Sequence, residues 1–207
     1  MYCSSSSINI LIEETTFTEC HTTSYSGGAI YFNVVGNCCL VKVCGYKCST
    51  LSDFYYQFDY IRVPDSDSNI NTVNDSSIAY SYNSNIDAWY TMRHDYGRFI
   101  SCAVNVSNNY CSRYSAIECC RCYTSLISFS SFANNTCHTY YTCLRFVDSN
   151  ADNEIRTSNV IRNKQSSSSY GTIYSSSSNL FIKDSCIVSN EANRDFYAYS
   201  CTITITK

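Results

Sequence analysis

The chain has 207 residues and a formal net charge of -3, with 44% apolar and 15% aromatic residues. Ser, Asn, Thr and Tyr supply 92 residues, whereas the helix formers Leu, Ala, Glu, Lys, Gln and Met supply only 30. This composition excludes a helical protein, and six Gly with one Pro exclude collagen. The apolar content excludes a disordered chain, so we expect a single folded domain over residues 1–207.

The charge distribution and the N-terminal sequence indicate which classes of partner to expect. The 14 Lys and Arg residues are scattered singly and form no basic stripe, so we expect no nucleic-acid partner. The first 14 residues have no basic start and only a short apolar run, unlike a secretory signal. No apolar run reaches the length of a membrane span, so we expect no membrane-spanning segment. Three glycosylation sequons occur, at Asn74, Asn105 and Asn134. They are weak evidence for secretion, because a chain this rich in Asn, Ser and Thr contains some sequons by chance.

From the N-terminus onward, the chain consists of short strand-like segments separated by clusters of Ser, Asn, Thr and Gly. Apolar or alternating segments lie at residues 8–12, 40–43, 126–129, 180–182 and 203–205. A motif in which a small or polar residue precedes an apolar one recurs at steps of 26 to 31 residues. Its central residues are Ala29, Gln57, Ala88, Ala116, Cys143, Thr172 and Ala198.

A second landmark lies about eight residues before most of these motifs and has a similar period. It falls at Cys20, Cys48, Asn109, Asn135, Asn163 and Asn190, with one gap of 61 residues that fits two coils. Units of about 28 residues are too short to bury a face alone and contain no helix for a crossover. We therefore predict an all-β, right-handed parallel β-helix of about seven coils. An antiparallel sandwich is the rival fold, and the constant phase of the landmarks argues against it.

This register makes two structural predictions. The apolar residues that follow the motif centres should form one inward column: Ile30, Phe58, Trp89, Ile117, Leu144 and Ile173. The Cys and Asn landmarks should share a narrow slot at a turn, where Asn amides stack as a ladder and satisfy backbone groups. Gly27 and Gly28 should supply a turn that uses positive φ.

The segment Phe17-Thr18-Glu19-Cys20 followed by Gly27-Gly28-Ala29-Ile30, and later Phe132-Ala133-Asn134-Asn135, resembles the GGAI and F-x-x-N repeats of chlamydial polymorphic outer-membrane proteins and related protist surface proteins. The resemblance implies a right-handed parallel β-helix that acts at a cell surface, often in adhesion. It therefore suggests an extracellular or cell-surface location, with glycans or other surface proteins as partners.

The fifteen Cys residues are an odd number, so they cannot all pair within one chain. Cys143 takes a slot held elsewhere by Ala, as expected of a buried thiol that packs as a small apolar group. Cys20 and Cys48, stacked one coil apart, would lie near the Cα separation of a disulfide. Adjacent Cys38-Cys39 and Cys119-Cys120 should each place one thiol inward and one outward.

One group of cysteines has a more specific interpretation, which is a zinc site. Cys119, Cys120 and Cys122, with Cys137-His138, offer thiolates and an imidazole, but a C-x2-C pair does not recur at the spacing of a zinc finger. We therefore expect no metal and no other cofactor.

Candidate catalytic residues are few. Many β-helical proteins cleave acidic polysaccharides, and the acidic candidates here are Glu13-Glu14, Asp65 with Asp67, and Asp148 with Asp152 and Glu154. Each lies in a polar turn, and none recurs at the coil period needed to pair carboxylates on neighbouring coils. Arg93-His94-Asp95 is the one compact cluster of these residue types, and neighbours in a strand face opposite sides, so it cannot form a triad. We assign no catalytic residue.

Two functions from different classes remain: a non-catalytic structural or adhesion-type interaction protein, which we favour, and a carbohydrate-active lyase or hydrolase. The chain begins and ends on strand-like segments without a cap, with Thr202-Ile203-Thr204-Ile205-Thr206 last. This predicts either a piece of a longer solenoid or end-to-end self-association.

Overall fold

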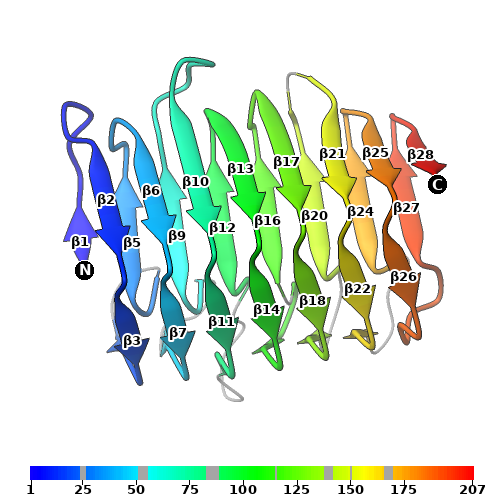
Figure 1. Cartoon of the computed structure of the whole chain (residues 1–207), viewed down its shortest axis with the longest axis horizontal. Helices are drawn as coiled ribbons and strands as arrows, with labels where there is room; N and C mark the ends of the chain where they lie inside the picture. The colour runs from blue at the N-terminus through cyan, green and yellow to red at the C-terminus, as the bar shows by residue number, and fades with distance from the viewer. Residues whose placement is uncertain are drawn as a thin grey trace.

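The structure is a computed structural model that describes residues 1–23, 27–50, 56–82, 89–114, 116–137, 142–149, 151–165 and 170–207. Within these ranges it contains strands and no helix. All the strand pairs are parallel, and each strand inside a sheet pairs with the equivalent strands one coil before and one coil after (Figure 1). The predicted all-β solenoid is confirmed, and its coils repeat every 28 residues or so.

Three long sheets form the walls of the solenoid. The first sheet consists of β1 (Tyr2–Cys3), β5 (Ile30–Asn33), β9 (Asp59–Arg62), β12 (Met92–Asp95), β16 (Ile117–Cys120), β20 (Leu144–Val147), β24 (Ile173–Ser176) and β27 (Phe196–Tyr199). The second sheet consists of β2 (Ile10–Glu13), β6 (Cys38–Val41), β10 (Ile70–Asn74), β13 (Arg98–Cys102), β17 (Thr124–Ser128), β21 (Asn153–Arg156), β25 (Leu180–Lys183) and β28 (Ile203–Thr206).

The third sheet has seven strands, and two small sheets follow it in the coil. The third sheet consists of β3 (Thr16–Thr18), β7 (Cys44–Tyr46), β11 (Ser77–Ala79), β14 (Asn105–Ser107), β18 (Ser131–Ala133), β22 (Asn159–Ile161) and β26 (Cys186–Val188). The small sheets are β15 (Tyr110–Cys111), β19 (Thr136–Cys137) and β23 (Lys164–Gln165), and β4 (His21–Thr22) with β8 (Ser49–Thr50).

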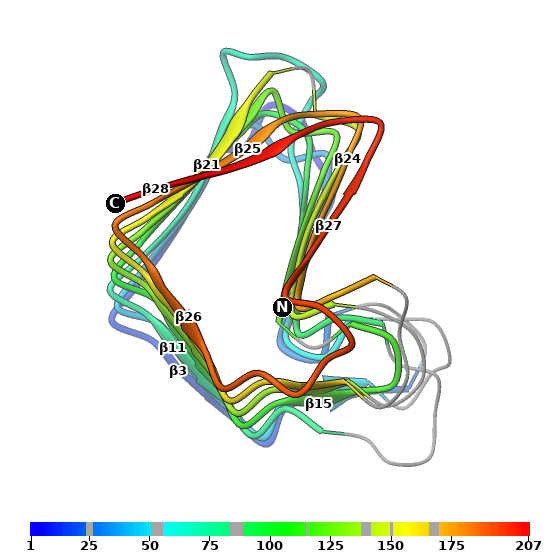
Figure 2. The same cartoon turned by 90° about the vertical axis from the view of Figure 1, so that its right-hand side faces the viewer.

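The solenoid is right-handed. Seen from its C-terminal end, the chain passes from the first sheet to the second and then the third in a counterclockwise sense while it approaches the viewer (Figure 2). This is the hand that twisted parallel strands favour, and it confirms the prediction.

The core lies between the three walls and is built from alternating inward residues. The third sheet contributes one inward residue from each strand, including Ile78, Val106, Phe132 and Val160, each fully buried. Cys143 is also buried, and it lies in the same slot as Ala116, as its small apolar character predicted.

The predicted inward column is correct in four coils and wrong in two. Ile30, Ile117, Leu144 and Ile173 are buried and aligned, but Asp59 and Met92 occupy the places that we assigned to Phe58 and Trp89. Phe58 is buried one position earlier, where it fills the space above Gly45, and Trp89 is half-buried. The predicted position lies one residue before the observed one at Phe58 and three residues before it at Trp89. The residue that takes the inward position after Phe58 is a buried Asp, which gives no apolar signal in the sequence.

Two of the predicted motif centres are also out of register. Gln57 lies one residue before its expected register, and Ala198 pairs with Ser175 in the interior of the strand rather than at its start. Ala88 lies outside the described residues.

The walls meet at corners where single residues adopt a left-handed backbone. Twenty non-glycine residues in the described ranges have φ between 46° and 64°, and Gly27, as predicted, has a φ of 74°. Every coil uses such a residue between the second and third sheets: Glu14, Lys42, Asp75, Ala103, Phe129, Thr157 and Asp184. The left-handed conformation is unfavourable for L-residues by roughly 1–2 kcal/mol, so this geometry must be imposed by the stacked sheets on either side.

The predicted asparagine ladder is confirmed at the corner after the third sheet. The backbone N–H and the side-chain Nδ2 of Asn109 both donate to Oδ1 of Asn135, at 3.1 and 3.0 Å. Asn135 donates in the same way to Asn163, and Asn163 to Asn190. Each Nδ2 also donates to a backbone carbonyl of the preceding coil. The ladder therefore satisfies buried backbone groups that no strand neighbour can reach.

The ladder slot continues toward the N-terminus with other small side chains. Ser81 fills the gap of 61 residues, and its backbone N–H donates to Oδ1 of Asn109 at 2.9 Å. Cys48 and Cys20 follow in register, as predicted, and the Cys48 thiol donates to the Phe17 carbonyl at 3.4 Å. Burial, which is the largest cause, raises the pKa of Cys48 to about 11, so this thiol stays protonated and can act as a donor.

A serine ladder at the second corner was not predicted. Backbone N–H groups donate to serine hydroxyls one coil away, as from Ser130 to Ser158 at 3.1 Å and from Ser158 to Ser185 at 3.2 Å. Each hydroxyl in turn donates to the carbonyl two residues before it. Ser is too common in this chain for such a ladder to be visible in the sequence.

Removing one rung of the asparagine ladder should destabilise the solenoid. Asn135→Ala leaves the backbone N–H and the amide of Asn109 without their acceptor, at roughly 1–3 kcal/mol for each stranded buried donor. We expect the free energy of unfolding to fall by about 2–4 kcal/mol in chemical denaturation. Asn105→Ala, at an exposed position, is the matched control and should cost less than about 0.5 kcal/mol. Equal losses for the two variants would contradict the ladder.

Relieving one left-handed corner should stabilise the fold. Ala103 is exposed with φ 56°, so Ala103→Gly removes only a methyl group and the strain that it causes. Gly also has more conformational freedom in the unfolded chain, and this offsets part of the relieved strain. We therefore expect the free energy of unfolding to rise by about 0.5–1 kcal/mol. Ala133→Gly, within β18, should instead cost about 0.5–1 kcal/mol. Thermal unfolding of both variants measures the difference, and a loss in both would show that the corner is unstrained.

Candidate functional site

The outer face of the first sheet carries a continuous row of aromatic and charged side chains. In register from the N-terminal to the C-terminal coil, the row consists of Tyr2, Tyr31, Tyr60, Arg93, Glu118, Arg145, Tyr174 and Tyr197. We call it the tyrosine–arginine row. Tyr2, Tyr31 and Tyr60 stack with ring centroids 5.4 and 5.3 Å apart, and Tyr174 stacks on Tyr197 at 5.7 Å. Such pairs contribute roughly 0.5–1.5 kcal/mol each beyond the area that they bury.

A second layer of tyrosines from the turns before the strands covers this row. Tyr56 stacks on Tyr60 at 5.1 Å, and Tyr90 stacks on Tyr114 at 4.2 Å. The Arg145 guanidinium lies over the rings of Tyr114 and of its row neighbour Tyr174. The middle of the row is therefore largely shielded from solvent.

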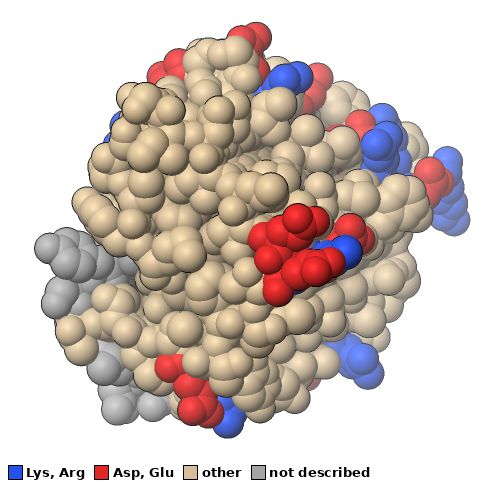
Figure 3. All heavy atoms as spheres, turned by 60° about the vertical axis from the view of Figure 1, so that its left-hand side comes forward, with Lys and Arg blue, Asp and Glu red and all other residues tan. Residues whose placement is uncertain are grey.

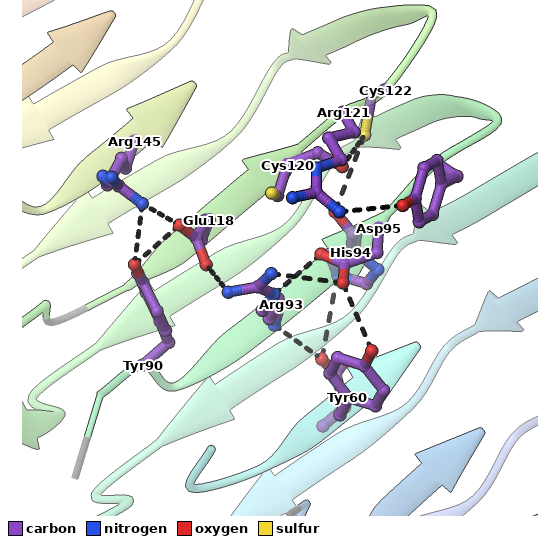
Figure 4. A network of polar contacts seen from close by, with 12 residues as sticks. Tyr60, Tyr90, Arg93, His94, Asp95, Glu118, Cys120, Arg121, Cys122 and Arg145 are labelled. Atoms are coloured by element: carbon purple, nitrogen blue, oxygen red, sulfur yellow. Dashed lines mark hydrogen bonds and ion pairs between the residues drawn. The ribbon is translucent and has the colours of Figure 1, made fainter. Parts of the chain in front are cut away.

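An ionic network occupies the middle of the row (Figure 4). Arg93 lies between two carboxylates, with its Nη1 2.6 Å from Glu118 Oε2 and its Nε 2.7 Å from Asp95 Oδ1. Glu118 is fully buried, and its Oε1 accepts from Tyr90 at 2.6 Å and pairs with Arg145. Tyr60 donates to Asp95 at 3.2 Å.

The charges of this network balance, because two guanidinium groups face two carboxylates. Breaking such a buried network by removing one partner costs about 3–5 kcal/mol, because an uncompensated charge remains. Each Glu118 oxygen is already engaged by a guanidinium or a phenol, so this carboxylate is not available to a substrate. The network links neighbouring coils on the outside of the solenoid.

The compact cluster Arg93-His94-Asp95 divides between the two faces, as strand alternation predicts. Arg93 and Asp95 face outward, whereas His94 is fully buried in the interior. There His94 Nδ1 lies 2.9 Å from Asn71 Nδ2, and its ring stacks on Phe99 at 4.3 Å. The three side chains do not form a triad.

Asp59 and His94 form a polar pair inside the solenoid. Asp59 Oδ1 lies 3.8 Å from His94 Nε2 and accepts the backbone N–H of Arg93 at 3.2 Å, and both side chains are fully buried. Burial raises the pKa of Asp59 well above its usual value, and burial lowers the pKa of His94 to about 3. Burial therefore favours the neutral form of each group, and His94 is uncharged near pH 7. They are sealed from solvent, so neither can serve a substrate.

The acidic candidates lie at the surface, and three of the seven pair with a side chain one coil away. Glu14 pairs with Lys42 at 2.7 Å and Glu154 with Lys183 at 3.0 Å, while Asp152 accepts from Asn179 at 3.0 Å. Glu13 and Asp67 are exposed.

The structure does bring two acidic candidates from separate coils to one place. Asp65 and Asp148 line a shallow surface hollow of 420 Å³ together with Tyr96 and Arg121. The Arg121 side chain donates to Tyr96 at 2.9 Å. Their 83-residue separation in the sequence hid this arrangement, which depends on the coil register.

The cysteines that suggested a zinc site do not converge. Cys119 and Cys122 are buried in the interior, Cys120 is in the outer face beside Asp95, and Cys137 pairs in register with Cys111 in a different sheet. His138 lies outside the described residues. Within the ranges that the structure covers, no group of three His, Cys, Asp or Glu side chains is arranged to hold a metal ion. No disulfide is present among the described cysteines.

No protein-family model, curated protein or solved structure matches this chain. The resemblance to polymorphic outer-membrane proteins therefore remains a prediction. In the described part of the chain, no helix is long and apolar enough to cross a membrane.

Sequence reasoning missed the tyrosine–arginine row. Glu118 and Arg145 were not singled out, although Arg93, Glu118 and Arg145 alternate in charge at steps of 25 and 27 residues. The available signal was this alternation, together with a Tyr at the second position of four of the eight strands in the first sheet.

The buried Asp59 carboxyl should make stability depend on pH. Its pKa is raised in the folded state, so above about pH 4 the unfolded chain loses a proton that the folded chain keeps. Stability therefore falls as the pH rises, by up to about 1.4 kcal/mol per pH unit, until the folded pKa is reached. Asp59→Asn removes this loss, so its free energy of unfolding should improve relative to wild type between pH 4.5 and pH 7.5.

Denaturant unfolding at the two pH values measures this effect, with Asp67→Asn as the exposed control. Two other ionisable groups lie near Asp59, namely His94, whose pKa is lowered by burial, and Cys38, whose pKa is raised by burial, and both are present in wild type and variant. A difference between Asp59→Asn and wild type that stays constant with pH would mean that Asp59 is ionised in the folded state.

Proposed function

We propose that this chain is a non-catalytic β-solenoid that acts as a rigid, adhesion-type interaction module. One observation supports the proposal most strongly. The buried carboxylates and the buried histidine that could act as acids or bases either bond to neighbouring side chains or lie out of reach of a substrate. Glu118 is engaged by Arg93, Arg145 and Tyr90, and Asp59 and His94 are sealed inside the solenoid.

The outer surface, in contrast, is suited to binding. Tyrosines and arginines are held in fixed positions by stacking and by cation–π contacts, as with Arg62 over Tyr96 and Arg194 over Tyr197. Rigid aromatic and arginine side chains dominate recognition surfaces, because they bury much area at a small entropic cost. Placement at a cell surface, with glycans or other surface proteins as partners, is part of this proposal and is supported by the sequence resemblance.

The competing function is carbohydrate cleavage, and the hollow lined by Asp65 and Asp148 is the place for it. Two carboxylates beside an arginine could supply an acid, a base and a charge-stabilising group. Both side chains are exposed to solvent, whereas catalytic carboxylates usually lie in a cleft where burial and neighbouring charges tune them. This favours binding over catalysis.

A panel of neutral and acidic polysaccharides, assayed for both retention and product formation, tests the proposal. We expect retention of some glycans and no new reducing or unsaturated ends after prolonged incubation. Asp148→Asn and Asp65→Asn should then leave retention unchanged. Product formation by the wild type that disappears in either variant, but persists in Asp67→Asn, would establish an enzyme and overturn the proposal.

A further inference from the structure

A groove runs along the corner that follows the third sheet, in the N-terminal half of the solenoid. It has a volume of 470 Å³, within the usual range for small-molecule sites. Its lining residues are Glu19, His21, Lys47, Tyr80, Tyr82 and Asn108. The groove is separate from the tyrosine–arginine row, which lies on the first sheet.

The ladder slot shapes this groove. Residues of the slot, such as Ser81, are buried and point inward, so the residues on either side of them point outward and form two walls. One wall consists of left-handed corner residues, among them Tyr80, and the other wall includes His21 and Tyr82. Tyr80 and Tyr82 thus lie on opposite walls of the same coil.

The two tyrosines are exposed but held in place. Tyr80 and Tyr82 are 51% and 52% exposed, which is unusual for large aromatic side chains. Tyr46 meets the Tyr80 ring edge-on at 5.6 Å, and Tyr110 meets the Tyr82 ring in the same way at 5.0 Å. Neighbouring tyrosines therefore limit the motion of both rings, which reduces the entropy lost on binding.

The polar groups of the groove balance in charge and offer both donors and acceptors. Lys47 pairs with Glu19 at 3.4 Å, and His21 Nδ1 lies 2.8 Å from the Ser49 hydroxyl. Asn108 adds an amide. On the face turned toward the N-terminal end, charged side chains form small groups of both signs in a mostly uncharged surface (Figure 3). Within the groove, the charges of Glu19 and Lys47 cancel, so the groove has no net charge to attract an ionic ligand.

The backbone of the groove excludes peptide recognition by strand addition. That mode needs unpaired N–H and C=O groups at a sheet edge. Here the backbone groups bond from coil to coil, as in Lys47 N–H to Ala79 O and Tyr110 N–H to Ser81 O. Recognition must therefore use side chains, namely aromatic faces with hydrogen-bonding groups around them.

We propose that this groove binds a neutral pyranose unit of a glycan, with Tyr80 and Tyr82 contacting the apolar C–H faces of the sugar. Lys47, Glu19, His21 and Asn108 surround the rings and bind the sugar hydroxyl groups. A pyranose has one apolar face and a rim of hydroxyl groups, and this matches the chemistry of the groove. The inference rests on the proposed binding function and gives it a site and a ligand class.

An array of neutral oligosaccharides built from hexose and N-acetylhexosamine units provides the probes, and titration calorimetry then measures the affinity for the best of them. Tyr80→Ala and Tyr82→Ala should each weaken binding about tenfold or more, because each removes one stacking surface. Tyr82→Phe keeps the ring and should stay within about threefold of wild type. Tyr199→Ala removes an equally exposed tyrosine, at 58% exposure, from the first sheet and should change nothing.

Tyr80→Ala and Tyr82→Ala each lose one edge-on ring contact at the surface, so their unfolding midpoints should fall only slightly and every variant should remain folded at the temperature of the titration. Binding that survives in Tyr80→Ala and Tyr82→Ala, absence of binding to every neutral glycan at millimolar concentration, or displacement by peptides alone would overturn the groove assignment. None of these results would contradict a non-catalytic function. Cleavage of the bound glycan would overturn the proposed function even if both alanine variants lose binding.

Discussion

The structure depends on one constraint, which is that the backbone at each corner of the coil must find partners without a strand neighbour. Buried N–H groups cost free energy when they are unpaired, and the ladder residues at these corners, such as Asn135 and Ser130, are buried. The ladder from Asn109 to Asn190 provides the acceptors and donors at one corner, and stacked serine hydroxyls provide them at another. Each side chain serves the coil beside it, so the ladders fix the register of neighbouring coils.

This register in turn determines what the outer surfaces present. Alternation within a strand sends every second side chain outward, and stacking aligns these side chains in rows along the solenoid. The tyrosine–arginine row is a row of this kind, and so are the two walls of the groove that Tyr80 and Tyr82 line. A shift of one residue in one coil would bury Arg93 and expose His94, so the surface chemistry is only as well defined as the ladder that holds the register.

The sequence predicted the fold class, the period and the asparagine ladder, because these depend on residue types that recur at one phase. It placed Leu144 and Ile173 correctly but misplaced Phe58 and Trp89, since a buried Asp59 breaks the apolar pattern on which the alignment relied. The Glu118 network, and the hollow that Asp65 and Asp148 both line, could not be predicted from the sequence. Outward residues obey no apolar rule, and their contacts follow from a register that must be known to within one residue.

The central claim is that neighbouring coils pair in parallel, in the register that the ladder sets. Nuclear Overhauser contacts between backbone protons of the isotope-labelled protein test it most directly. The account predicts contacts between Ile127 and Ile155, between Phe132 and Val160, and between Thr136 and Lys164, three pairs from successive walls of the same two coils. Contacts typical of antiparallel pairs, or a shift of one residue in any of the three, would contradict it.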